Sequence, residues 1–287
     1  MFNRLSLLCT VFLLFAAVPA YAEATNQDLK DCISGSSDHA QVVKACTNAL
    51  TRQGISTEQR AIYLNYRGMA HHEAGEYDLA IADYSEALGG YQHQVLYFNR
   101  GKSWDEKGDY PKAIGDYSEA IERQPDWVLA LSKRGILYIL TKDFERAITD
   151  FDRVIGLRPN SSDAYSDRGA AYEIWGKLDQ AKADFDKALE ISPTNVDALV
   201  SRAGIALFEK DDATYIRFIT RAIELAPDRA VLFAERCFAW RRQKQNQKAE
   251  VDCATAVKLD PALAEPLSGN HKGPVSLSSN RALKSVE

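Results

Sequence analysis

The sequence predicts an all-α fold, a solenoid of stacked helix–turn–helix hairpins, and two observations carry this prediction. The first is a constant period. Proline recurs every 34 residues along the chain, at Pro125, Pro159, Pro193, Pro227 and Pro261. A constant period of this length is typical of repeated copies of one supersecondary unit, which bury a continuous core by stacking.

The second observation is a pair of apolar stripes within each period. In the copy that ends at Pro125, the stripes flank a turn at Gly108, and their members are Tyr97, Gly101 and Trp104, then Ala113, Tyr117 and Ala120. Two amphipathic helices joined by a turn form a helical hairpin. A glycine inside a helix costs about 1 kcal/mol relative to alanine, which is explained if the two helices cross at Gly101. The proline ends the second helix and begins the next copy.

The period also sets the order of the chain. We expect a degenerate capping unit at 23–60, six hairpin units over 61–262, and a disordered tail without a helical stripe at 263–287. End units of a repeat array are atypical because each has a neighbour on one side only. The fifth full unit, 196–229, departs most from the others, because Tyr215 replaces the small Ala.

Residues 1–22 are a different kind of sequence. Arg4 precedes an apolar stretch of about a dozen residues that ends in Ala20-Tyr21-Ala22, which is the pattern of a secretory signal peptide. The alternative, an uncleaved membrane anchor, would need ~20 apolar residues to span a bilayer. We expect cleavage after Ala22, export to the periplasm or the medium, and no membrane span in the mature chain.

The repeat resembles the tetratricopeptide repeat (TPR). The family pattern is a large residue followed by Gly, Tyr, Ala, Phe or Tyr, Ala and Pro, and it is met by Tyr165, Gly169, Tyr172, Ala181, Phe185, Ala188 and Pro193. The resemblance covers about residues 30–262. It implies a right-handed superhelix whose first helices line a concave groove that holds peptides or protein surfaces. It implies neither catalytic residues nor a cofactor.

In the TPR family the residue before the Gly is usually apolar, whereas this chain has an arginine there. An Asp recurs 16 residues after the arginine. Because partly buried charges need partners, we expect structural ion pairs within the hairpins: Arg67–Asp83, Arg100–Asp116, Arg134–Asp150, Arg168–Asp184 and Arg236–Asp252. The alternative is an arginine ladder that binds an anionic ligand. In the fifth unit Phe218 replaces the Asp, and we expect Arg202 to be solvated.

Four cysteines remain beyond residue 22, namely Cys32, Cys46, Cys237 and Cys253. An even number in an exported chain is typical of disulfides. Cys237 and Cys253 take the Gly and aromatic positions of the last unit, which face each other across a TPR hairpin, and the other two match them in the capping unit. We expect the bonds Cys32–Cys46 and Cys237–Cys253, each worth roughly 3 kcal/mol in the chain-entropy model. The alternative is redox or metal chemistry, but no Cys-x-x-Cys occurs.

TPR geometry assigns the groove to four positions of each first helix. The predicted partner-binding residues are Phe98, Lys102, Asp105, Leu129, Ser132, Ile136, Ile139, Asp163, Ser166 and Glu173. Equivalent positions further along are Val200, Leu207, Phe238 and Arg241. An apolar patch with a charged rim fits a peptide or a helix. The alternative is that curvature or the tail covers the patch, with residues 275–277 as an internal ligand.

Motifs that carry chemistry are absent from the sequence. It has no Gly-rich phosphate loop, nucleophile elbow or His-Glu-x-x-His, and we expect no metal site. His71 stands where other copies place Trp104 or Tyr138, so we expect it to pack. The net charge of −5 contrasts with the basic face of a nucleic-acid binder. We therefore expect a non-catalytic scaffold for another protein or peptide; the alternative is an accessory protein associated with cell-wall glycan.

Overall fold

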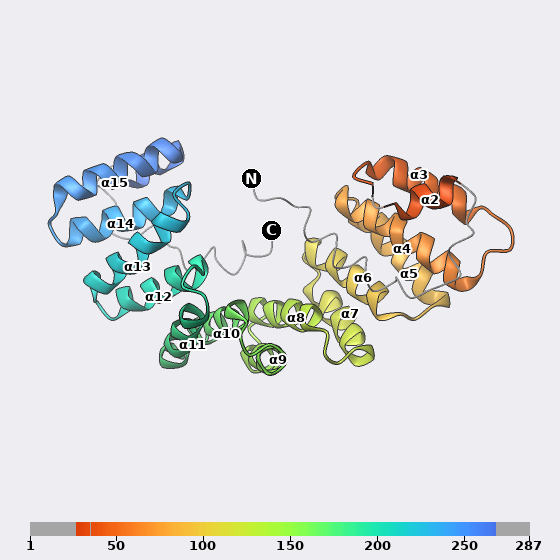
Figure 1. The fold of residues 1–287 in the computed structure, drawn as a ribbon, viewed down its shortest axis with the longest axis horizontal. Helices are drawn as coiled ribbons and strands as arrows, with labels where there is room; N and C mark the ends of the chain where they lie inside the picture. Colours follow the sequence, from red (N-terminus) through yellow and green to blue (C-terminus); the bar gives the residue numbers. More distant parts are fainter. Residues whose placement is uncertain (1–26, 35, 268–287) are drawn as a thin grey trace. The chain divides into compact units, whose positions relative to one another are not determined.

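The computed structural model of the chain describes residues 27–34 and 36–267, and every regular element in these ranges is a helix. The predicted signal peptide, 1–22, lies outside the described residues. The chain forms two compact units that divide between Asp116 and Tyr117. Within each unit consecutive helices pair into hairpins (Figure 1), which confirms the predicted all-α hairpin fold.

The first unit contains a short pair of helices followed by longer hairpins. The elements are α2 (Gln27–Ile33), α3 (His39–Leu50), α4 (Thr57–Glu73), α5 (Tyr77–Gly90), α6 (Gln94–Glu106) and α7 (Tyr110–Arg123), the last of which contains the division between the units. The α4 helix begins at Thr57 because Ser56 accepts a hydrogen bond from the amide of Gln59, and the Gln59 side chain bonds back to the Ser56 amide. This start lies ahead of the predicted unit boundary at residue 61.

The second unit repeats one hairpin four times. Its helices are α8 (Val128–Leu140), α9 (Phe144–Leu157), α10 (Ser162–Ile174), α11 (Leu178–Ile191), α12 (Val196–Phe208), α13 (Asp212–Leu225), α14 (Ala230–Arg242) and α15 (Asn246–Leu259). A 3₁₀ turn, η2 (Pro261–Leu263), and a short helix, α16 (Ala264–Leu267), follow. Leu263 and Leu267 are buried against the core of the last hairpin. Residues 263–267 of the predicted disordered tail are therefore helical, and the rest of that tail, 268–287, lies outside the described residues.

The turn inside each of the six hairpins from α4–α5 to α14–α15 has a left-handed residue. Glycine supplies it at Gly75, Gly108 and Gly176, with φ between 76° and 82°. Lysine occupies the same position in the other three hairpins, at Lys142, Lys210 and Lys244, with φ between 58° and 63°. Glycine adopts this conformation without steric cost, whereas a residue with a Cβ does not. Half of the hairpins therefore carry backbone strain at this turn.

The recurring helical glycine marks the place where the two helices of a hairpin touch. A Cβ atom added to Gly169 would lie 2.7 Å from the ring of Phe185, and one on Gly135 would lie 2.9 Å from Phe151. Any side chain here would push the helices apart, because the rings are fully buried. The cost of glycine in a helix is thus offset by a close helix crossing.

The hairpin α12–α13 solves the same packing problem with the sizes exchanged. The α10–α11 hairpin packs Tyr172 of its first helix with the small Ala181 of its second. In α12–α13 the first helix carries Ala206 and the second carries Tyr215, 0% and 1% exposed in one core cluster. The unusual Tyr215 therefore fills the volume that a first-helix aromatic fills elsewhere.

Candidate protein-binding face

Five of the six recurring arginines are each held by a carboxylate of the same hairpin. The Nε and Nη2 atoms of Arg134 donate to the two oxygens of Asp150, at 2.8 and 2.7 Å. The same two-point geometry joins Arg67 to Asp83, Arg100 to Asp116, Arg168 to Asp184 and Arg236 to Asp252. These five carboxylates are 2–6% exposed, so each pair neutralises a charge that would be costly alone.

Each arginine also reaches back to the hairpin before it. The Nη1 atom of Arg168 donates to Asp152 at 2.6 Å, and that of Arg134 donates to the hydroxyl of Ser118 at 2.9 Å. Equivalent bonds join Arg67 to Thr47, Arg100 to Ser85 and Arg236 to Thr220. Sequence reasoning missed this contact, although an oxygen-bearing side chain 15 to 20 residues before each arginine could have indicated it. These guanidinium groups are engaged on both sides by the protein itself, as expected of structural ion pairs.

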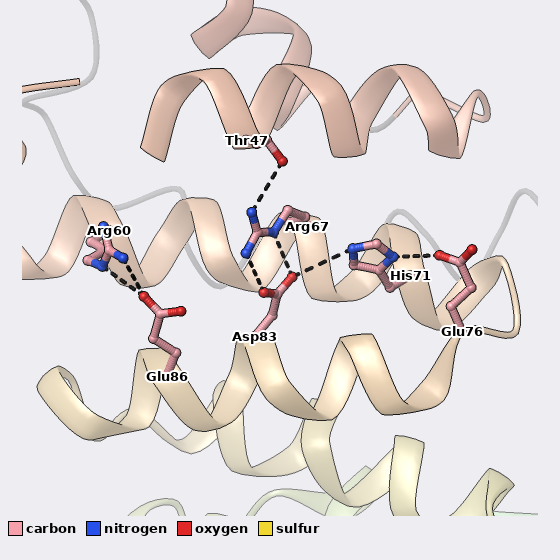
Figure 2. A network of polar contacts seen from close by, with 7 residues as sticks. All are labelled: Thr47, Arg60, Arg67, His71, Glu76, Asp83 and Glu86. Carbon is pink, nitrogen blue, oxygen red and sulfur yellow. Dashed lines mark hydrogen bonds and ion pairs between the residues drawn. The ribbon is translucent and has the colours of Figure 1, made fainter. Parts of the chain in front are cut away.

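The first full hairpin adds a histidine to this network. Figure 2 shows Arg67 between Thr47 of α3 and Asp83 of α5, with His71 beside the same aspartate. The Nδ1 atom of His71 lies 2.6 Å from an oxygen of Glu76, and its Nε2 atom lies 4.0 Å from Asp83. The ring is buried. His71 therefore packs, as expected, and in addition bridges two carboxylates.

Arg202 of the fifth full hairpin contradicts the expectation that it is solvated. It is 8% exposed, and its Nε atom donates to Asp186 of the preceding hairpin at 2.8 Å. The ring of Phe218, which replaces the aspartate, lies 5.5 Å from the guanidinium carbon. The Nη1 atom is buried without a hydrogen-bond partner among the described residues. The backward contact thus replaces the lost forward one, because a buried guanidinium needs an acceptor.

Both cysteine pairs lie at bonding distance. The sulfur atoms of Cys32 and Cys46 are 2.09 Å apart, and those of Cys237 and Cys253 are 1.99 Å apart. The first pair joins α2 to α3 and the second joins α14 to α15. Within residues 27–34 and 36–267, no three His, Cys, Asp or Glu side chains gather in a way that could hold a metal ion.

The ten predicted groove residues fall in both units and differ in exposure. Leu129 is 41% exposed and Asp163 is also exposed; Lys102, Asp105, Ser132, Ile136 and Glu173 are half-buried; Phe98, Ile139 and Ser166 are buried. Burial removes Ile139 from the surface that a partner could touch. The exposed part of the expected apolar patch is therefore Leu129. The half-buried Ile136 lies seven residues further along α8, on the same face of the helix.

Charge gathers on the first helices of the second unit. Asp163 and Asp167 are one turn apart on α10, and the side-chain amide of Asn195, at the start of α12, donates to Asp163 at 3.3 Å. Burial, together with the charges of Asp163 and Asp197, raises the pKa of Asp167 to about 7, and Lys133 opposes this shift. Asp167 has no hydrogen bond or ion pair within the described part of the chain.

The first helices of the first unit carry a different set of groups. The Asn99 side chain donates to the Asn65 side chain at 2.9 Å, and both are buried. His72 contacts the hydroxyl of Ser103 at 2.9 Å. Burial and the charge of Lys102 lower the pKa of His72 to about 4. This region therefore disfavours added positive charge, whereas the region around Asp167 disfavours added negative charge.

Comparison with solved structures gives the same fold. A tetratricopeptide repeat protein from Parabacteroides merdae is 21% identical with a TM-score of 0.65, over 84% of this chain and 98% of that one. The C-terminal part of a TPR protein from Cytophaga hutchinsonii is 20% identical with a TM-score of 0.64, over 81% and 94%. YrrB, described as a TPR protein with an unusual peptide-binding site, is 20% identical with a TM-score of 0.54, over 70% and 99%.

No curated protein matches the chain significantly. Family models, however, find the same repeat in the sequence as the structural comparison. No described helix has the length and apolar character required to cross a membrane. Sequence models described as Tetratricopeptide repeat match residues 43–94 and 98–164, and a further one matches residues 135–206, which together is more than half of the chain. The chain therefore belongs to the tetratricopeptide repeat family.

Proposed function

We propose that this protein is a non-catalytic scaffold that binds a peptide or a protein surface through the first helices of its second unit. One observation carries the proposal. The α8 helix is apolar on the side that packs in the core, where Leu131 and Leu137 are fully buried, and also at Leu129 and Ile136. The apolar residues of a surface helix normally face the core, yet Leu129 is 41% exposed.

The family and one structural neighbour support this proposal. TPR proteins as a family hold peptides and protein surfaces, and YrrB is described as having a peptide-binding site. An exposed apolar side chain beside charged groups is the composition of a peptide-binding surface. We further propose that the protein is exported, with the periplasm as its compartment. The signal-peptide pattern of residues 1–22 and the two bonded cysteine pairs support this, because disulfides persist in oxidising compartments.

The test is photocrosslinking in living cells from a photoreactive amino acid at position 129. We expect a defined protein adduct that disappears when Ile136 in the same chain is replaced by Glu. The matched control places the photoreactive residue at position 157, because Leu157 is 47% exposed on the second helix α9. Equal adducts from positions 129 and 157, or none from 129, would contradict the proposal. Co-sedimentation of the purified protein with peptidoglycan would instead support the glycan-associated alternative.

A further inference from the structure

The acidic cluster of α10 and α12, formed by Asp163, Asp167 and Asp197, includes one carboxylate, that of Asp167, to which no cation is bonded within the described residues. Asp163 and Asp197 lie in the first turns of their helices, where the helix dipole stabilises negative charge. Asp167 lies a turn further along and has neither that stabilisation nor a hydrogen bond within the described residues. Arg229 approaches Asp197 at 3.7 Å, and Lys133 of α8 is the cation whose charge acts on Asp167. A further positive group here would relieve the repulsion among the three carboxylates.

The chain itself supplies positive groups after its last described residue. Residues 268–287, which we call the tail segment, contain Lys272, Arg281 and Lys284 against a single acidic residue, Glu287. Between the cations lies the apolar-containing stretch Val275-Ser276-Leu277. The positive charge of the tail segment therefore complements the carboxylates of α10, and its apolar residues complement the exposed Leu129.

The place where the tail segment begins is fixed. The Leu267 side chain is 4% exposed in the core of the last hairpin, and its carbonyl accepts a hydrogen bond from Arg241 at 2.9 Å. Arg241 belongs to the first helix α14 and occupies a predicted groove position. The last described residue therefore lies against the first helix α14.

The distances allow the segment to follow the first helices. Neighbouring packed helices are about 10 Å apart, so α10 lies roughly 20 Å from α14 if α12 is between them. Eight residues of extended chain, from Leu267 to Val275, span about 26 Å. Lys272 and Val275 can therefore reach α12 and α10 without strain.

We propose that the tail segment binds across α12 and α10 of its own molecule, with its cations against Asp163, Asp167 and Asp197. The proposal rests on the proposed function, because the tail segment would occupy the surface that a partner needs. An external partner would then have to displace it, and such a partner would itself carry positive charge. Burial and the neighbouring carboxylates raise the pKa of Asp167, and a cation of the tail segment beside it would act in the opposite direction, because it favours the ionised carboxylate.

The test is a photoreactive residue at position 275 of the full chain, with the adduct mapped by peptide mass spectrometry. We expect crosslinks within one molecule to peptides of α10 and α12. The double variant Asp163→Lys with Asp197→Lys should lower their yield about tenfold. The matched control is Asp179→Lys, because Asp179 is an exposed first-turn acid of the second helix α11, and it should leave the yield unchanged. Circular dichroism checks that the variants remain folded.

Other outcomes overturn the inference. Crosslinks that fall elsewhere, that join two copies of the chain, or that respond equally to both charge reversals would each contradict it. Deletion of residues 268–287 separates this inference from the proposed function. If position 129 captures a partner equally well with and without the tail segment, the scaffold function stands and the inference fails. If position 275 crosslinks to α10 and no partner is captured from position 129 in either form, the inference stands and the scaffold function fails.

Discussion

The hairpins α10–α11 and α12–α13 are neighbours that share the same backbone arrangement but differ in the side-chain contacts between their two helices. In the first, Arg168 is bound by Asp184 of its own hairpin and by Asp152 of the previous one. In the second, Arg202 has no carboxylate partner in its own hairpin among the described residues, and it donates to Asp186 of the previous hairpin.

The polar contacts of α12–α13 therefore point outward to its neighbours. Tyr215, which takes the place of a small residue, donates its hydroxyl hydrogen bond to the buried Glu235 of α14. The comparison teaches that a repeat can lose its internal ion pair and remain in the array, because contacts between adjacent hairpins replace it.

The largest effect that separates the two hairpins should come from their exchanged aromatic residues. Tyr215→Ala should destabilise the protein by about 4 kcal/mol, because it leaves a cavity in a core where Tyr215 is 1% exposed. Adding Ala206→Tyr to that variant should recover part of the loss, because it restores the arrangement of Tyr172 and Ala181. Urea unfolding followed by circular dichroism measures both changes. A double variant that is no more stable than Tyr215→Ala alone would show that the sizes are not exchanged between these two positions.

The next effect concerns two equivalent aspartates. Asp152 and Asp186 are 53% and 52% exposed in their side chains and bind Arg168 and Arg202 from the preceding hairpin. We expect Asp186→Ala to cost about 2 kcal/mol or more, because it removes the acceptor that the buried guanidinium of Arg202 uses within the described part of the chain. Asp152→Ala should cost less than about 1 kcal/mol, because Arg168 keeps Asp184. Equal losses in urea unfolding would mean that Arg202 finds another acceptor.

A smaller effect comes from the turns. Gly176 and Lys210 both have left-handed backbone conformations, with φ of 82° and 60°. Lys210→Gly should therefore stabilise the protein by about 1 kcal/mol, and Gly176→Lys should destabilise it by a similar amount. Thermal unfolding detects the two shifts, which are expected to have opposite signs. Shifts in the same direction would show that the lysine side chain, not the backbone, dominates at this turn.

The last difference in stability depends on pH. It concerns Asp167 of α10, whose destabilising effect on the free energy of unfolding is absent at acidic pH and grows as the pH rises. The folded-state pKa of Asp167 is about 7, above its ordinary value of 3.8, so the folded protein holds a proton that the unfolded chain releases. Its contribution to stability is complete below about pH 4 and is lost as the pH rises through 7. Asp167→Asn should match the parent near pH 4 and be more stable at pH 8. The measurement is the difference in urea midpoint between Asp167→Asn and the parent protein at pH 5 and at pH 8. An equal difference at the two pH values would contradict the raised pKa of Asp167.

The first unit offers the opposite pH response. Burial and Lys102 lower the pKa of His72 to about 4, below its ordinary 6.5, so the stability that its neutral form contributes is present above pH 6.5 and lost as the pH falls toward 4. His72→Gln should remove that loss. As the pH rises through this range, the titration of Asp167 lowers the stability and that of His72 raises it. Measuring the two variants side by side separates the two contributions.

The repeat period allowed much of the fold to be predicted. Spacing alone located the hairpins, the close approach at Gly169, and the residues of the Arg–Asp pairs, because each of these depends on contacts within one hairpin. The exposure of the candidate face was harder to predict. Leu129 and Ile139 are both predicted groove residues of α8, yet Ile139 is buried and Leu129 is exposed.

The sequence by itself determined the helical hairpins, the pairing of the four cysteines by repeat position and the ion pairs inside each hairpin. These follow from local periodicity, which every copy states again. The tertiary structure decided what depends on the neighbouring copy: the backward contact of each arginine, the acceptor of Arg202, the hydroxyl of Tyr215 on Glu235 and the isolation of the Asp167 carboxylate. The physical reason is that stacking brings together side chains whose partners are set by the packing between hairpins, and the period within one hairpin does not encode that packing.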